Sequence, residues 1–88
     1  MTERTVDVPE GVGLHARPAA MFVQAATAAG VGVTVARPGG EPVDARSILA
    51  VLSLDVRGGE QVVLRADGDD SVLDALERVI RESGSAGG

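Results

Sequence analysis

Residues 31–45 read VGVTVARPGGEPVDA, and this stretch decides the fold because it contains two strand-like segments around a tight turn. Val31, Val33 and Val35 alternate along the first segment, which is the period of a half-buried strand. The RPGG segment turns the chain, so that EPVDA can return as a second strand beside the first. We therefore expect a β-hairpin in the middle of the chain.

Outward from this hairpin, the pattern alternates between strands and helices. Further strands are expected at residues 2–8 and 60–66, and helices at 16–29, 47–56 and 71–82. The order strand, helix, strand, strand, helix, strand, helix favours an α+β fold of the split βαβ class, with an antiparallel sheet and the helices on one face. We expect one domain at residues 1–83 and a flexible tail at 84–88.

Helical spacing supports the three helices. Ser47 is the candidate N-cap of the middle helix. Along the last helix, Asp74 stands four residues before Arg78, and Glu77 four before Arg81, which is the spacing of helical ion pairs. The apolar stripes expected to face the sheet are Ala19, Phe22, Val23 and Ala26 on the first helix and Leu73, Leu76, Val79 and Ile80 on the last.

Composition narrows the function of this 88-residue chain. A formal net charge of −5 and a single aromatic residue, Phe22, argue against nucleic acid and anionic lipid as partners. The chain has no cysteine and one histidine, so we expect no disulfide, no metal and no cofactor. No apolar stretch approaches the roughly 20 residues of a membrane-spanning helix, and MTERTVDV is not a secretory signal. A soluble, cytoplasmic protein without membrane insertion is expected.

The single histidine lies in the segment GLHARPAA, residues 13–20, just before the first predicted helix. Pro18 suits the first turn of a helix, where backbone N–H groups have no intrahelical partner. The free amides of Ala16 and Arg17, the helix dipole and the Arg17 guanidinium would form a small site for an anion such as a phosphoryl group. These positive surroundings favour a neutral, nucleophilic His15. Spacing alone favours the alternative, in which His15 is an incidental loop residue or an N-cap substitute.

The second predicted helix is apolar over more of its circumference than one buried stripe requires. Val51 and Leu54 are three residues apart and suit the side that faces the sheet. Ile48, Leu49 and Leu52 then form a candidate apolar patch for a partner protein. The alternative is a short helix that is buried more deeply than usual.

Two motifs resemble those of a known family. GLHARPAA is similar to the active-site signature of HPr, the histidine-containing phosphocarrier family of the bacterial sugar phosphotransferase system. DARSILAVLSL, residues 44–54, is similar to the family's second signature, around its regulatory serine. The separation of the motifs, the chain length and the order of elements also agree. The resemblance implies an open-faced β-sandwich, in which three helices cover one side of a four-stranded antiparallel sheet.

The resemblance also implies roles. His15 would accept a phosphoryl group on Nδ1 from enzyme I, which draws it from phosphoenolpyruvate, and pass it to IIA domains of sugar permeases. Arg17 would stabilise the phosphoryl group, Pro18 would fix the helix start, and Ser47 matches a serine that HPr kinase/phosphorylase modifies in some bacteria. The protein would be a monomeric, stoichiometric carrier rather than a free-standing enzyme. Partner contacts are assigned to Ala20, Met21, Ile48, Leu49 and Leu52.

Other functions stay open on the sequence. An HPr-like carrier of a nitrogen-related or dihydroxyacetone-kinase chain would share this chemistry, and a non-catalytic binding domain would use only the patch on the second helix. A small phosphatase of the acylphosphatase type needs an asparagine to position water, and the chain has none. Two positions depart from many HPr proteins: Val12 replaces a small polar residue and Ala16 a hydroxyl residue.

Overall fold

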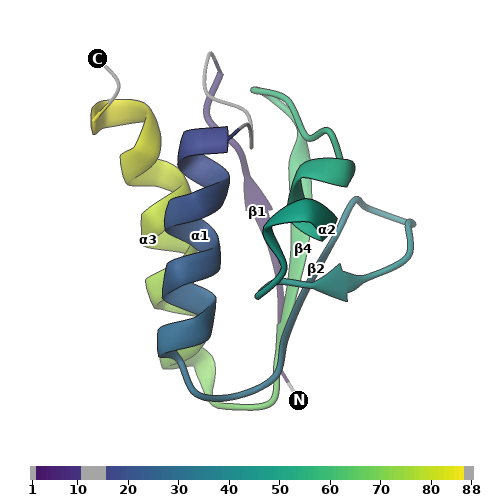
Figure 1. The fold of residues 1–88 in the computed structure, drawn as a ribbon, viewed down its shortest axis with the longest axis vertical. Coiled ribbons are helices and arrows are strands. Elements are labelled where there is room, and N and C mark those ends of the chain that lie inside the picture. Colours follow the sequence, from purple (N-terminus) through teal and green to yellow (C-terminus); the bar gives the residue numbers. More distant parts are fainter. Residues whose placement is uncertain (1, 11–15, 87–88) are drawn as a thin grey trace.

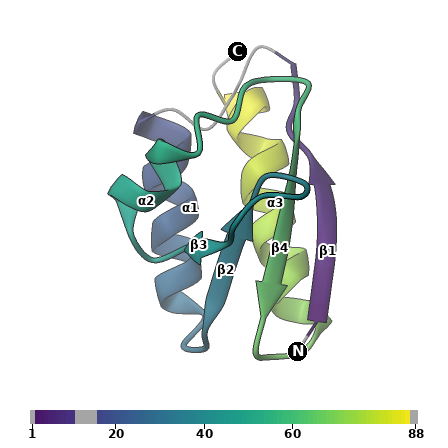
Figure 2. The ribbon, with the colours of Figure 1, turned by 90° about the vertical axis from the view of Figure 1, so that its right-hand side faces the viewer.

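The computed structural model describes residues 2–10 and 16–86, and in this part of the chain a four-stranded sheet carries three helices. The strands have the order β1-β4-β2-β3, and every neighbouring pair is antiparallel. Figures 1 and 2 show α1 and α3 side by side on one face of the sheet. The predicted α+β class is therefore confirmed. The elements are β1 (Thr2–Asp7), α1 (Ala16–Ala28), β2 (Val33–Ala36), β3 (Val43–Asp44), α2 (Ile48–Ser53), β4 (Gln61–Ala66) and α3 (Asp70–Ala86).

The central hairpin forms as the sequence predicts. Strand β3 returns beside β2, with Thr34 opposite Asp44 and Val35 opposite Val43. The turn contains Gly39 at a φ of +76°, a conformation that glycine adopts without steric cost. Because β3 has only two residues, β2 pairs mainly with β4 on its other side, and β4 in turn pairs with the whole of β1.

The core lies between the sheet and the helices. On β4, the alternation of Val62, Leu64 and Ala66 with more exposed residues follows the predicted strand period. Phe22 is fully buried, so the chain's single aromatic ring packs in the core. The predicted stripes supply the buried side chains of the long helices, which are Ala19, Phe22 and Ala26 on α1 and Leu73, Leu76 and Ile80 on α3.

Helix α3 differs from its prediction in length and in one ion pair. It continues to Ala86, past residue 83, because a helix that is already formed extends at little cost. Glu77 and Arg81 form the predicted pair at 2.8 Å between Oε2 and Nη2. Asp74, however, lies 2.6 Å from Nη1 of Arg4 on β1, and the predicted contact with Arg78 is wrong.

No helix in the described ranges is long and apolar enough to cross a membrane.

Candidate functional site

The first turn of α1 carries the described part of the predicted phosphoryl site. Helix α1 begins at Ala16, and Pro18 is its third residue, where a missing N–H costs no intrahelical hydrogen bond. Pro18 and Ala19 are buried and fix this turn against the rest of the molecule, whereas Arg17 is exposed. The amides of the first turn, including those of Ala16 and Arg17, lack intrahelical acceptors. His15 lies outside the described residues.

Arg17 differs from most arginines of this protein in its surroundings. All eight basic residues of the chain are arginines. Six of them lie within ion-pair distance of a carboxylate. Within residues 2–10 and 16–86, only Arg17 and Arg78 have no such partner. The Arg17 guanidinium therefore remains available to an added anion beside the positive end of the α1 dipole.

The exposed side of α1 continues from Arg17 along the helix. Met21 and Gln24 follow it by four and seven residues, so the three side chains share one face. Met21 is 41% exposed and Ala20, on the flank of this face, is half-buried. An apolar side chain thus stands one helical turn from the free arginine.

Helix α2 presents a second apolar side chain. It packs against α1, and its last turn lies at the same end of the molecule as the first turn of α1 (Figure 1). Leu49 is 77% exposed, and Leu49 and Met21 are the two large exposed hydrophobic residues of the described chain. Ile48 and Leu52 are half-buried and pack against the core, and Val51 is fully buried. Of the predicted three-residue patch, Leu49 is therefore the main exposed part.

Ser47 caps α2 at its start, as the sequence predicts. Its backbone is extended, and its Oγ accepts a hydrogen bond from the backbone N–H of Ala50 at 3.3 Å. The side chain is half-buried. Because α2 has six residues, it depends on such caps and on packing for its stability.

Replacing Ser47 with alanine is expected to lower the free energy of unfolding by about 1 kcal/mol, since the cap is lost. This change corresponds to a fall in Tm of roughly 4–8 °C for a domain of this size. Ser53→Ala is the matched control, because Ser53 Oγ donates to the carbonyl of Ala50 within the same helix. Thermal melts followed by circular dichroism measure the Tm of both variants. Equal losses in the two variants would contradict a capping role.

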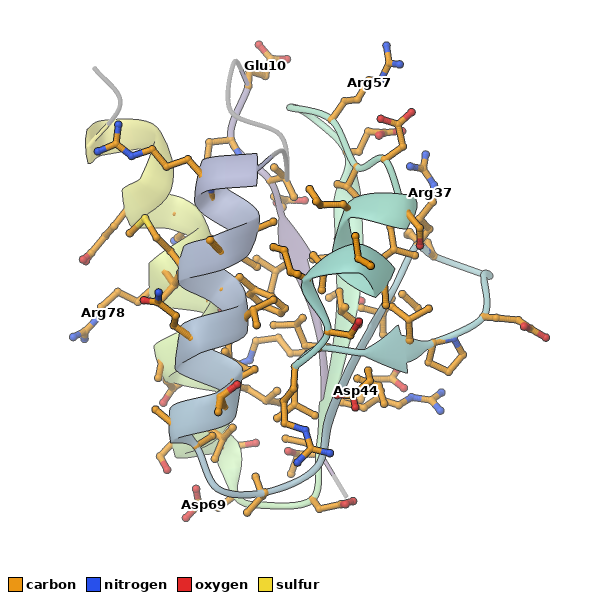
Figure 3. All side chains as sticks on the ribbon, in the orientation of Figure 1. Glu10, Arg37, Asp44, Arg57, Asp69 and Arg78 are labelled. Carbon is orange, nitrogen blue, oxygen red and sulfur yellow. The ribbon has the colours of Figure 1, made fainter. Side chains whose placement is uncertain are left out.

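At the other end of α2, Arg37 forms contacts that the sequence did not reveal. Arg37 lies beside the end of α2 (Figure 3). Its Nη1 donates to the carbonyl oxygens of Leu54 and Asp55, at 3.0 and 3.1 Å, and its Nη2 lies 2.6 Å from Oε2 of Glu60. The backbone N–H of Arg57 and then the Arg37 guanidinium hold the pKa of Glu60 below its usual value. Arg37 was predicted only as part of a turn, because its partners are 17 to 23 residues away.

No group of three or more His, Cys, Asp or Glu side chains suited to a metal ion occurs among the residues that the structure describes. The candidate site thus consists of the first turn of α1 with Arg17 and, on the same face of α1, the exposed Met21; Leu49 is a further exposed apolar side chain on the neighbouring α2. Such an arrangement can hold an anion next to a surface that buries against another protein.

The chain is similar to known proteins in sequence and in fold. The family model described as "PTS HPr component phosphorylation site" matches residues 2–82. The phosphocarrier protein HPr of Streptomyces coelicolor is 51% identical over 84 residues, which cover 93% of this chain and 90% of that protein. A crystal structure of HPr from Thermoanaerobacter tengcongensis superimposes with a TM-score of 0.85 at 38% identity, over 97% of both chains. A dimer of HPr from the same organism superimposes with a TM-score of 0.68 at 39% identity, over 93% of this chain and 95% of the other.

Proposed function

The chain belongs to the HPr family of phosphocarriers of the phosphotransferase system, and from this premise we propose that His15 accepts a phosphoryl group from phosphorylated enzyme I and passes it to IIA domains of sugar permeases. The bond between phosphorus and enzyme I breaks as a bond between phosphorus and Nδ1 of His15 forms. The second transfer breaks this bond in turn, so the protein ends unchanged. The protein is thus a stoichiometric carrier that needs no cofactor.

The observation that carries this proposal is the free, exposed Arg17 in the first turn of α1. A phosphoryl group on the residue before the helix would lie beside the unpaired amides of this turn and beside the positive end of the dipole. A guanidinium without a carboxylate partner adds charge-assisted hydrogen bonds to its oxygens. Arg17 and the amides of Ala16 and Arg17 would therefore hold the group between the two transfers.

The experiment that tests this function is incubation with phosphoenolpyruvate and enzyme I. We expect one phosphoryl adduct per chain by mass spectrometry, labile in acid and stable in alkali, as for a phosphohistidine. The rate of phosphoryl transfer is then measured to a IIA domain of a sugar permease and to the recipient proteins of nitrogen-related and dihydroxyacetone-kinase chains. The recipient that is phosphorylated fastest identifies the system that the protein serves. Absence of any adduct would refute the carrier function.

Partner proteins would dock on the apolar side chains that α1 and α2 present. Leu49 is the main contact, because burying its exposed side chain removes apolar surface from water. Met21 extends the contact along the face that carries Arg17. Ala20, Ile48 and Leu52 are half-buried and would supply the edges of the surface.

Leu49→Glu is expected to weaken binding to enzyme I about tenfold or more, because a charge replaces an apolar side chain at the centre of the contact. The fold should persist, since Leu49 is 77% exposed and a carboxylate suits the first turn of a helix. Isothermal titration calorimetry measures the affinity. Ala75→Glu adds the same charge at an exposed position of α3 and is the control. Similar losses in both variants would contradict docking at Leu49.

Ser47 is proposed as a regulatory site for HPr kinase/phosphorylase, because a phosphate on its oxygen would replace the cap of α2 and add negative charge beside Leu49. Incubation with that kinase and ATP tests the assignment.

We further propose that the carrier acts as a cytoplasmic monomer with residues 1–83 as its domain. Sedimentation of the purified protein tests the monomer against a dimer such as that of the T. tengcongensis relative.

A further inference from the structure

Helix α2 is held by packing along one side, where Val51, Ile48 and Leu52 contact the core, and by contacts at its two ends. It has six residues, and Val51 is its one fully buried side chain. So short a helix has little stability of its own. The Ser47 cap at its start and the contacts at its end therefore add to this packing in setting the direction of α2, and with it the direction of Leu49. Helix α1, by contrast, has three fully buried side chains along its length.

The contacts at the end of α2 converge on Arg37, which follows β2. Leu54 is the C-cap of α2, and Asp55 follows it with a φ of +50°, the left-handed conformation that ends many helices. Arg37 Nη1 donates to the carbonyl oxygens of Leu54 and Asp55 at 3.0 and 3.1 Å. One guanidinium therefore holds the two residues that directly follow the helix.

The same guanidinium also connects α2 to the turn that precedes β4. Nη2 lies 2.6 Å from Oε2 of Glu60, whose Oε1 accepts from the backbone N–H of Arg57 at 2.8 Å. Two backbone hydrogen bonds connect this turn to Val8. The N–H of Val8 donates to the carbonyl oxygen of Glu60, and the N–H of Gly59 donates to the carbonyl oxygen of Val8, both at 2.8 Å. The network thus joins β2, α2 and the end of β1.

We propose that Arg37 is a positioning residue for partner docking, which fixes the end of α2 so that Leu49 is presented beside the face of α1 that carries Arg17. This role rests on the proposed carrier function, because it assigns Arg37 to the docking surface of that function. Arg37 itself contacts neither the phosphoryl group nor the partner. Its effect is carried through the carbonyls of Leu54 and Asp55, which directly follow α2, and through Glu60.

The test compares Arg37→Gln with Arg65→Gln. Arg65 is a matched control, because its side chain is 50% exposed against 42% for Arg37, and it pairs with Glu3 at the same 2.6 Å, but on the sheet. We expect Arg37→Gln to raise the Kd for enzyme I about tenfold, because the charge-assisted hydrogen bonds to Leu54 and Asp55 at the end of α2 are lost. The rate of phosphoryl transfer at saturating enzyme I should stay unchanged. Arg65→Gln should leave both values unchanged, and Arg37→Lys should restore part of the affinity.

Amide hydrogen exchange provides a second measurement that does not depend on enzyme I. Arg37→Gln should speed exchange at the α2 amides and leave the β4 amides unchanged. An unchanged Kd, equal losses in the Arg37→Gln and Arg65→Gln variants, or exchange that rises throughout the sheet would each overturn the positioning role. If the protein without substitutions accepts no phosphoryl group, the carrier function is refuted independently of Arg37. Hydrogen exchange at the α2 amides then still shows whether Arg37 holds this helix.

Discussion

His15→Ala is expected to abolish the phosphoryl adduct that phosphoenolpyruvate and enzyme I form on this protein. The chain has no second histidine and no lysine, so no other side chain can form the same acid-labile, alkali-stable bond between nitrogen and phosphorus. Serine and threonine hydroxyls would give esters, which resist acid. Mass spectrometry before and after acid treatment should therefore show an adduct on the unchanged protein and none on the variant.

The control for this prediction is binding of the His15→Ala variant to enzyme I, which shows that the variant is folded. The four-stranded sheet is built from residues 2–7, 33–36, 43–44 and 61–66, and Phe22 and Ala26 anchor α1 in the core, so we expect the variant to keep the fold. His15→Ala should thus bind enzyme I with an affinity close to that of the unchanged protein while accepting no phosphate. An acid-labile adduct that persists in the variant would contradict His15 as the acceptor and would move the search to another residue.

The features that the sequence predicted well depend on neighbours in the chain. The alternation of Val62 and Leu64 with more exposed residues defines β4. The spacing of three and then four residues from Ala19 through Phe22 to Ala26 defines the buried side of α1. The cap at Ser47 is equally local, because its acceptor and donor are three residues apart. The spacing of apolar residues and the capping of a helix both depend on residues that are close in the sequence, and the structure confirms both predictions.

The features that the sequence missed depend on residues that only the fold brings together. Asp74 has an arginine four residues later, yet it binds Arg4, which is 70 residues away and lies on the strand that α3 crosses. Arg37 was assigned to a turn, although its three acceptors come from the end of α2 and from Glu60. No local pattern distinguishes an arginine that binds distant carbonyls from one that is solvated.

The candidate site falls between these two cases. The sequence predicted the helix start at Pro18 and the position of Arg17, because both follow from the rules for a first turn. It did not predict that Arg17 would lack a carboxylate partner, since pairing is decided by the other elements. It also treated Ile48, Leu49 and Leu52 alike, whereas burial separates Leu49 from the other two.

Arg17→Glu is expected to slow phosphoryl transfer at least about a hundredfold, which is the order of loss when one donor to a developing or bound oxyanion is removed. Here the loss is compounded by repulsion between the new carboxylate and the phosphoryl oxygens. The fold should be retained or slightly stabilised, because Arg17 is exposed and a carboxylate in the first turn of α1 interacts favourably with the helix dipole. Rapid-quench measurement of transfer from phosphorylated enzyme I gives the rate.

Arg78→Glu is the control that separates local from global charge. Arg78 is the other arginine without a carboxylate partner in the described ranges, it is exposed, and it points away from the molecule on α3 (Figure 3). Both substitutions move the formal net charge from −5 to −7, so any effect of overall charge on the encounter with enzyme I is the same in both. If transfer slows only in Arg17→Glu, the effect belongs to the first turn of α1. Equal slowing in the two variants would assign it to net charge, and the role of Arg17 at the phosphoryl group would be wrong.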